Sequence, residues 1–184
     1  MKRQERKKEP ENVRRRLLDA AGGIAAANGV SAITLDAVAR AAGVSKGGLL
    51  HHFPGRQALV KALGARALED WDKELRRLME DDPVPEGRFT RAYLRSTVDG
   101  GEMFDHRVAV ALTVATCTDE TLRNQWNEWL GAHTATEGGD ERTVRRHLVR
   151  AAVDGLWVAA FTGVNVADAP TRAAMVEKLM EMTF

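Results

Sequence analysis

The segment from Thr34 to Arg56 concentrates the side chains that could bind or transform another molecule. It reads TLDAVARAAGVSKGGLLHHFPGR and places Lys46 and the pair His51-His52 around two consecutive glycines. A lysine near the start of a short helix can bind a phosphate together with free backbone N–H groups. Adjacent histidines on a helix point in different directions, so they do not form a pair of metal ligands. These residue types favour contact with a polyanion.

The other candidates for catalysis or metal binding form no recognisable motif. His106, His133 and His147 lack the spacing of zinc ligands, and the single cysteine, Cys117, excludes an intramolecular disulfide. We find neither a glycine-rich phosphate loop after a strand nor a nucleophile with its base. We therefore expect no enzyme, no metal and no cofactor, and a location in the reducing cytoplasm.

Charge is distributed unevenly along the chain. Residues 1–66 contain 13 Lys and Arg against 5 Asp and Glu, whereas residues 67–184 contain 14 against 21. A basic first third joined to an acidic remainder favours a polyanionic partner at one end. Eight of the cations lie in residues 1–16, so a solvated basic tail accounts for part of the asymmetry equally well.

The composition is that of a globular chain without membrane segments. Of the 184 residues, 44% are hydrophobic and 29% charged, which separates the chain from disordered proteins. No apolar run approaches the length of a transmembrane helix. The basic N-terminus lacks the apolar run and cleavage site of a secretory signal, so we expect no membrane partner and no export.

Helical spacing of apolar residues runs through most of the chain and predicts an all-α protein of about nine helices. Thr34 and Ser45 are expected to cap two short helices, Thr118 to cap a later one, and Asp168 to lie near the cap of the last. The expected helices cover residues 12–28, 35–42, 46–53, 56–80, 88–99, 102–115, 119–132, 141–162 and 170–182.

The two short helices, separated by Gly43-Val44, have the pattern of a helix-turn-helix. Small or apolar residues would pack the two helices together, and the start and rim of the second helix would face DNA. Gly47 and Gly48 destabilise a helix by about 1 kcal/mol each relative to alanine. They therefore indicate either close helix packing or close approach of the backbone to a groove of DNA.

This stretch resembles the TetR family of bacterial transcriptional regulators. The resemblance covers about residues 13–60 and combines an amphipathic helix ending in NGV with ITLDAVARAAGVSKGGLLHHFPGRQAL. It implies an N-terminal three-helix helix-turn-helix domain over residues 1–56. It further implies a larger helical domain over residues 57–184 that binds an effector and dimerises.

The resemblance also implies which residues touch DNA. Threonine, lysine and histidine side chains of the motif would contact phosphates, and Arg56 would reach the DNA backbone. The glycine pair, Lys46 and Leu50 would contact bases, although the family commonly has tyrosine at the position of Leu50. The basic arm, residues 2–8, is expected to act through nonspecific electrostatic attraction. The implied DNA-binding set is Thr34, Ser45, Lys46, Gly47, Gly48, Leu50, His51, His52 and Arg56.

The expected helix 141–162 is apolar on two faces, so it must be covered twice. One cover is its own domain, and the other would be a symmetry mate. The final helix carries Met175, Leu179 and Met182 at a similar spacing. Two helices from each chain would then form a two-fold four-helix interface of a homodimer. The alternative is a central helix buried in a monomer.

Tryptophan is concentrated in the second part of the chain, where aromatic walls with a few acidic groups would suit flat, lipophilic ligands, including cations. The alternative is that these side chains belong to the core. The expected effector pocket is lined by Trp71, Phe104, Leu112, Trp126, Trp157 and Phe161.

These features predict a dimeric repressor that binds a palindromic operator on double-stranded DNA and is released by a small lipophilic effector. The segment EDWDKELR and the SKGGLL variant resemble the multidrug-responsive subgroup, which implies control of an efflux transporter. Two alternatives stay open, a DNA-binding protein that responds to no ligand and a transcriptional activator.

Overall fold

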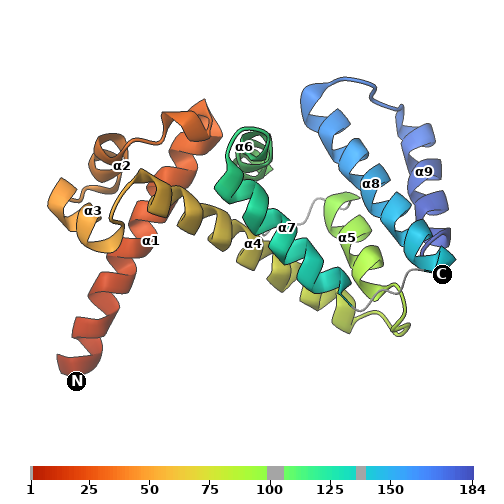
Figure 1. Ribbon diagram of the computed structural model, residues 1–184, viewed down its shortest axis with the longest axis horizontal. Coiled ribbons are helices and arrows are strands. Elements are labelled where there is room, and N and C mark those ends of the chain that lie inside the picture. The colour runs from red at the N-terminus through yellow and green to blue at the C-terminus, as the bar shows by residue number, and fades with distance from the viewer. Residues whose placement is uncertain (1, 99–105, 136–139) are drawn as a thin grey trace. The chain divides into compact units, whose positions relative to one another are not determined.

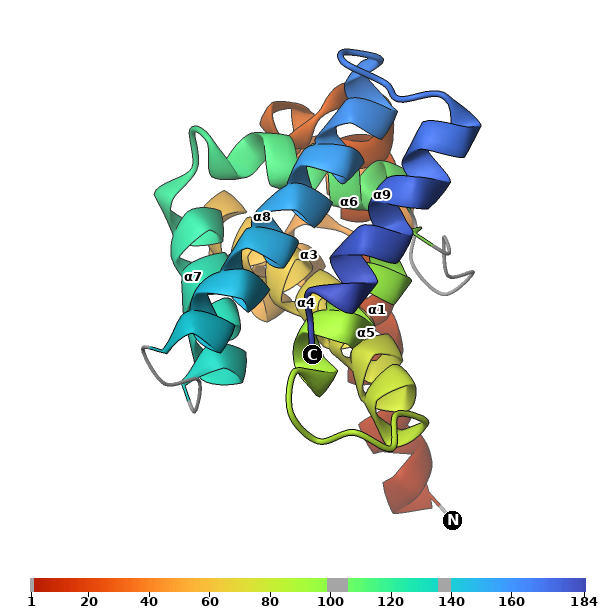
Figure 2. The same ribbon diagram turned by 90° about the vertical axis from the view of Figure 1, so that its right-hand side faces the viewer.

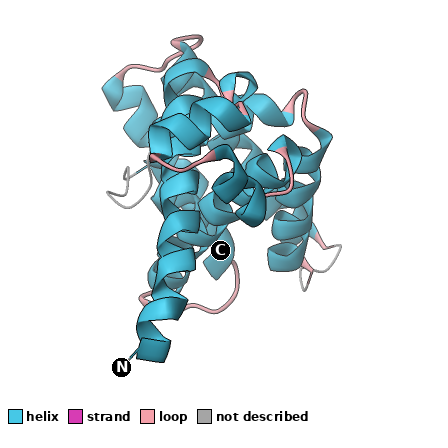
Figure 3. Ribbon diagram, turned by 90° about the vertical axis from the view of Figure 1, so that its left-hand side faces the viewer, coloured by secondary structure: helices cyan, strands magenta, loops and turns pink. Residues whose placement is uncertain are grey.

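The computed structural model describes residues 2–98, 106–135 and 140–184, which form nine α-helices and one 3-10 turn without any strand (Figure 3). The all-α prediction is confirmed. None of the helices in these ranges combines the length and apolar content that a membrane span requires. The elements are α1 Lys2–Asn28, η1 Val30–Ala32, α2 Leu35–Ala42, α3 Lys46–His52, α4 Arg56–Glu80, α5 Arg88–Val98, α6 His106–Thr116, α7 Glu120–Thr134, α8 Glu141–Thr162 and α9 Ala169–Glu181.

Two helix starts differ from the prediction. α1 begins at Lys2 and contains Pro10, because the Lys, Arg, Glu and Gln residues before residue 12 favour helix even without an apolar stripe. Thr118 does not cap α7; Asp119 accepts the Leu122 N–H at 3.2 Å, while the Thr118 hydroxyl donates to a carbonyl of α6 at 3.4 Å. The start predicted for α6, at residue 102, lies outside the described residues.

The chain divides into two compact units. Unit 1 consists of Met1–Glu69 with Asp105–Trp129, and unit 2 of Asp70–Phe104 with Leu130–Phe184. Both α4 and α7 therefore contribute one end to each unit. The functional boundary predicted after residue 56 stays a prediction.

The core of unit 1 holds the two short helices against α1 (Figure 1). Leu17 and Ala21 of α1 are buried with Val38 of α2 and Leu49 of α3. Burying a leucine or valine side chain contributes about 1.5–3 kcal/mol, so this shared core fixes how α2 and α3 are presented. α6 packs on α1 from within the same unit.

The first half of α4 lies unusually close to the first half of α7 within unit 1. A Cβ atom at Gly64 would lie 2.6 Å from Leu122 Cδ2 and 2.9 Å from Gln125 Oε1. The Gln125 side chain donates to the Lys61 carbonyl at 3.0 Å, and Gln57 donates to Thr121 Oγ1 at 3.0 Å. A side chain at position 64 would therefore require the side chains of Leu122 and Gln125 to shift.

In unit 2, α5 packs on both α8 and α9, which lie side by side (Figure 2). Tyr93 and Leu94 of α5 are buried together with Val149 and Val153 of α8. Leu179 of α9 is also buried in this unit. The three helices thus form the centre of unit 2.

A buried ion pair closes the loop between α4 and α5. Arg91 is 1% exposed and Asp82 5% exposed. The guanidinium donates to the Asp82 carboxylate at 2.6 and 3.2 Å and to the carbonyls of Val84 and Glu86 at 2.6 and 2.9 Å. It also lies 4.5 Å from the centre of the Phe184 ring. The hydrogen bonds from Arg91 hold the pKa of Asp82 below its ordinary value.

Candidate nucleic-acid interface

The two short helices are defined by their ends. Thr34 caps α2 by accepting the Ala37 N–H at 3.1 Å, and Ser45 caps α3 by accepting the Gly48 N–H at 3.1 Å. Gly43 ends α2 in the left-handed region, with φ of 62°, where glycine carries no steric penalty. The predicted caps at Thr34 and Ser45 are confirmed, and α3 begins two residues after the Gly43-Val44 turn.

The two glycines of α3 have different surroundings. A Cβ atom at Gly48 would lie 3.0 Å from Val44 Cγ1 and 3.2 Å from Ser45 Oγ, whereas one at Gly47 would have nothing within 4 Å. Packing against the turn therefore accounts for Gly48. It does not account for Gly47, which is exposed on the surface of α3.

One face of α3 is exposed and mixed in character. Lys46, Gly47, Leu50 and His51 are exposed, while His52 is half-buried with its ring centroid 5.4 Å from that of His51. The face therefore combines a cation, bare backbone, an apolar side chain and an imidazole.

Lys46 has a partner in the structure. Its ammonium forms an ion pair with Asp36 of α2, with Nζ at 3.0 Å from Oδ1 and both side chains exposed. An exposed ion pair of this kind contributes about 0–1 kcal/mol. The lysine can therefore exchange the carboxylate for a phosphate at little cost in free energy.

Arg56 makes contacts that the sequence did not indicate. Its Nε donates to the Ile33 carbonyl at 2.8 Å and its Nη2 to the Val30 carbonyl at 2.9 Å. Two of the three guanidinium nitrogens thus hold the segment before α2 to the start of α4. A direct contact of Arg56 with the DNA backbone stays a prediction, with the two N–H groups of Nη1 and the second N–H of Nη2 as the remaining donors.

Two further arginines of α1 support the motif, and the sequence analysis did not single them out. Arg16 donates through Nη2 to the Ala42 carbonyl, at the end of α2. The Arg14 guanidinium lies 5.3 Å from the centre of the Phe53 ring, within the range of a cation–π contact. From the sequence, the arginine-rich stretch indicates only positive charge. These contacts become visible only in the fold, because they join residues that are far apart in the sequence.

The residues predicted for the effector pocket have different surroundings. In unit 1, Leu112 belongs to the core, and the ring centroid of Trp126 lies 5.5 Å from that of Trp129. In unit 2, Trp157 and Phe161 pack edge to face at 4.9 Å. Phe104 lies outside the described residues. Their assembly into one pocket stays a prediction.

The sixth predicted residue, Trp71, belongs to an aromatic cluster in unit 2. Its ring lies 5.1 Å from Tyr93, and its Nε1 donates to Ser96 Oγ at 3.1 Å. The Tyr93 hydroxyl donates to Asp154 at 2.5 Å. Burial raises the pKa of Tyr93, and partial burial also raises the pKa of Asp154. This cluster therefore places a carboxyl group beside aromatic rings, and its contact with an effector stays a prediction.

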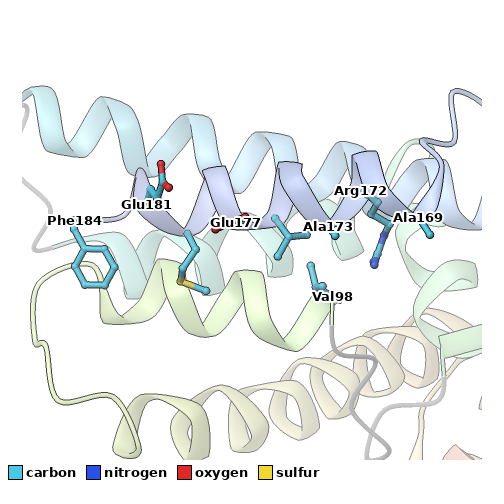
Figure 4. Close-up of a pocket in the computed structure, with 9 residues that line it drawn as sticks. Val98, Ala169, Arg172, Ala173, Glu177, Glu181 and Phe184 are labelled. Atoms are coloured by element: carbon cyan, nitrogen blue, oxygen red, sulfur yellow. The ribbon is translucent and has the colours of Figure 1, made fainter.

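A cavity of about 690 Å³ lies between α5 and α9 of unit 2. Figure 4 shows Phe184 and Arg172 at opposite ends of this groove and Val98 on the α5 side. The described residues among those predicted for the effector pocket do not line it. Its walls are formed by Val98, Ala169, Arg172, Ala173, Val176, Glu177, Met180, Glu181 and Phe184.

Metal ligands are not clustered in the described part of the chain, where no group of three or more His, Cys, Asp or Glu side chains is placed to hold a metal ion. Cys117 is exposed.

A short capped helix, a turn through a left-handed glycine and a second helix with an exposed face together define a DNA-binding protein of the helix-turn-helix class.

Comparison with known proteins gives the family. The family model described as "Bacterial regulatory proteins, tetR family" matches residues 17–63, and "Tetracyclin repressor-like, C-terminal domain" matches residues 87–184. The chain belongs to the TetR family and is a transcriptional regulator. Proteins of this kind are not enzymes, which agrees with the expectation from the sequence.

Similarity to individual proteins is high over a short stretch in one relative and otherwise concerns the fold. "HTH-type transcriptional regulator SrpR" of Pseudomonas putida is 44% identical over 55 residues, which are 30% of this chain and 26% of SrpR. A TetR-family member from Streptomyces coelicolor A3 is 20% identical with a TM-score of 0.69, covering 94% of this chain and 98% of that chain. The "multidrug binding protein EbrR complexed with malachite green" is 20% identical with a TM-score of 0.69, over 93% and 98% of the two chains.

Proposed function

We propose that this regulator is a repressor that binds a palindromic operator as a homodimer and dissociates when a small lipophilic effector binds. The observation that carries the proposal is the exposed face of α3, held by two capped helices against the core of unit 1. In this proposal residues 1–56 bind DNA and residues 57–184 bind the effector and dimerise. The two copies of α3 enter successive major grooves, about 34–36 Å apart.

The salt dependence of operator binding tests the DNA contacts. Each neutralised phosphate contributes about 0.9 to the slope of log affinity against log salt, so Lys46→Ala in both subunits lowers the slope by about 2. Lys73→Ala is the matched control, because Lys73 is an exposed lysine in a 2.9 Å ion pair outside the motif. If the slope for Lys46→Ala equals that of the wild type, as expected for the Lys73→Ala control, Lys46 is not part of the interface.

The proposed dimer interface uses the apolar face of α8 that its own unit does not cover. Val144, Leu148, Ala151, Gly155 and Val158 are all exposed, at helical spacing along α8. The opposite face is buried in unit 2. A second copy related by a two-fold axis would cover this stripe with the same stripe of its own.

On α9, the contribution to this interface differs from the prediction. Met175 is exposed, but Leu179 is buried within unit 2. The reason is that α9 turns its Leu179 face towards α5 and α8. The proposed interface therefore uses Met175 and not Leu179.

Gly155 provides a sharp test of the dimer. A side chain at Gly155 meets nothing within 4 Å in the subunit, and the same holds at Gly131 of α7. Gly155→Leu should leave the subunit folded and yield a monomer in sedimentation velocity, whereas Gly131→Leu should remain a dimer. A wild-type protein that sediments as a monomer at micromolar concentration would refute the homodimer.

The effector is proposed to be an aromatic, lipophilic compound, with an efflux transporter as the regulated gene. EbrR, of similar fold, is described as binding malachite green, so this dye is the probe. The dye should quench the tryptophan fluorescence and weaken operator binding by about 1–3 kcal/mol. Trp71→Phe should reduce the quenching more than Trp129→Phe, which lies outside the predicted set. Equal quenching in both variants would argue against Trp71 as a pocket residue.

A further inference from the structure

Leu50 is an apolar side chain on the surface of α3. It is 41% exposed, whereas its neighbour Leu49 is completely buried. Among the described residues of unit 1, only Leu50 and Val114 are exposed large hydrophobic side chains. Protein-docking patches usually cover several hundred Å². A lone leucine does not form such a patch, so its position favours contact with an isolated apolar group.

The residues around Leu50 make its face of α3 close-fitting. Lys46 and Gly47 precede it by four and three residues, so they share its side of the helix. Both are exposed, and a side chain at Gly47 would meet nothing within 4 Å. The protein itself thus does not require glycine there for packing. The bare backbone at Gly47 allows the surface of α3 next to Leu50 to approach a base edge closely.

The major groove contains one apolar group that a leucine can recognise. Phosphates, and the donor and acceptor atoms of the bases, require hydrogen-bonding or charged partners, which leucine lacks. The C5-methyl group of thymine is apolar and is displayed only in the major groove. Lys46, one turn earlier on the same face, can bind a neighbouring phosphate or guanine while Leu50 lies against the methyl group.

We propose that Leu50 reads the C5-methyl group of one thymine in each half-site of the operator. This inference rests on the operator binding proposed above and adds the chemical group that is recognised. Leu50 is then a specificity-determining residue, because it favours thymine over the three bases that lack this methyl group. Burying one methyl-sized group corresponds to roughly a four-fold change in affinity.

The test removes only the methyl group from the DNA. Duplexes bound by the wild-type protein are first selected from a random pool. Each thymine of the best duplex is then replaced by deoxyuridine in both half-sites, and dissociation constants are measured by fluorescence anisotropy. One deoxyuridine position should weaken wild-type binding by roughly four-fold per half-site. Leu50→Ala should bind the thymine and deoxyuridine duplexes equally well.

Val114→Ala serves as the matched control, since it shortens the other exposed hydrophobic side chain of unit 1 and should keep the discrimination. Alanine is a good helix former, so circular dichroism should show Leu50→Ala folded. The inference is overturned if no deoxyuridine substitution weakens the wild-type protein, or if Leu50→Ala discriminates as the wild type does. If no duplex is enriched at all, operator binding itself fails, and the inference fails with it.

Discussion

The buried ion pair of unit 2 gives a quantitative prediction about stability. Asp82→Asn keeps the shape of the side chain but leaves the Arg91 guanidinium, which is 1% exposed, without its counter-charge. Removing one partner of a buried pair destabilises a protein by about 3–5 kcal/mol. The residues that cover the pair, 83–86, are themselves exposed, so we expect the lower end of this range.

The same pair makes the effect depend on pH. The pKa of Asp82 is lowered in the folded protein from an ordinary value of 3.8, mainly by the hydrogen bonds from Arg91. As the pH falls, the Asp82 carboxylate is protonated in the unfolded chain before it is protonated in the folded protein. The ion pair then contributes less to the free energy of unfolding. The contribution is therefore complete above about pH 4. Below it, the difference between wild type and Asp82→Asn should narrow.

Urea unfolding followed by circular dichroism measures the effect. Asp81→Asn is the matched control, because Asp81 is the adjacent acid, is exposed and lies 3.6 Å from Arg77. We expect this control to change the free energy of unfolding by less than about 1 kcal/mol. If Asp82→Asn were no more destabilising than Asp81→Asn at pH 7, the reasoning about the buried guanidinium would be wrong.

Three other substitutions test the local geometry of unit 1 by thermal unfolding. Ser45→Ala removes the cap of α3 and should destabilise the protein by about 1 kcal/mol, with no such effect for Ser31→Ala; equal midpoints would contradict the cap. Gly64→Ala places a Cβ atom 2.6 Å from a Leu122 methyl group and should destabilise by about 1–3 kcal/mol. Gly23→Ala meets nothing within 4 Å and should stabilise α1 by up to about 1 kcal/mol; a lower unfolding midpoint would count against this.

The ends of the short helices were predictable because they depend on neighbouring residues. The caps at Thr34 and Ser45 and the left-handed Gly43 each involve contacts within a few positions in the sequence. Such contacts leave a local signature, which is a hydroxyl before an apolar run or a glycine after it. The helix-turn-helix therefore followed directly from the sequence.

The long-range hydrogen bonds of the motif were not predictable. Arg16 and Arg56 bond to backbone carbonyls 23 to 27 positions away. Every residue has such a carbonyl, so no residue type marks it as a partner. Sequence reasoning accordingly assigned these cations to tail charge and to DNA, whereas in the fold their guanidinium groups donate to backbone carbonyls of unit 1.

The effector pocket shows a second boundary of sequence reasoning. Helical periodicity identifies an apolar face, but it does not distinguish a face that lines a ligand site from one that fills a core. Leu112, for example, was predicted to line the pocket because it lies on an apolar helix face, but it belongs to the core of unit 1. Likewise, the aromatic ring of Tyr93 next to Trp71 was not anticipated.

The two hydrogen bonds from Arg56 have a consequence for signalling. The Arg56 side chain joins the first turn of α4 to the carbonyls of Val30 and Ile33. A rotation of that turn would therefore displace the segment that leads into α2. A movement of α4 would accordingly tilt α2 and α3 together. Arg56 would transmit this movement without itself touching the nucleic acid.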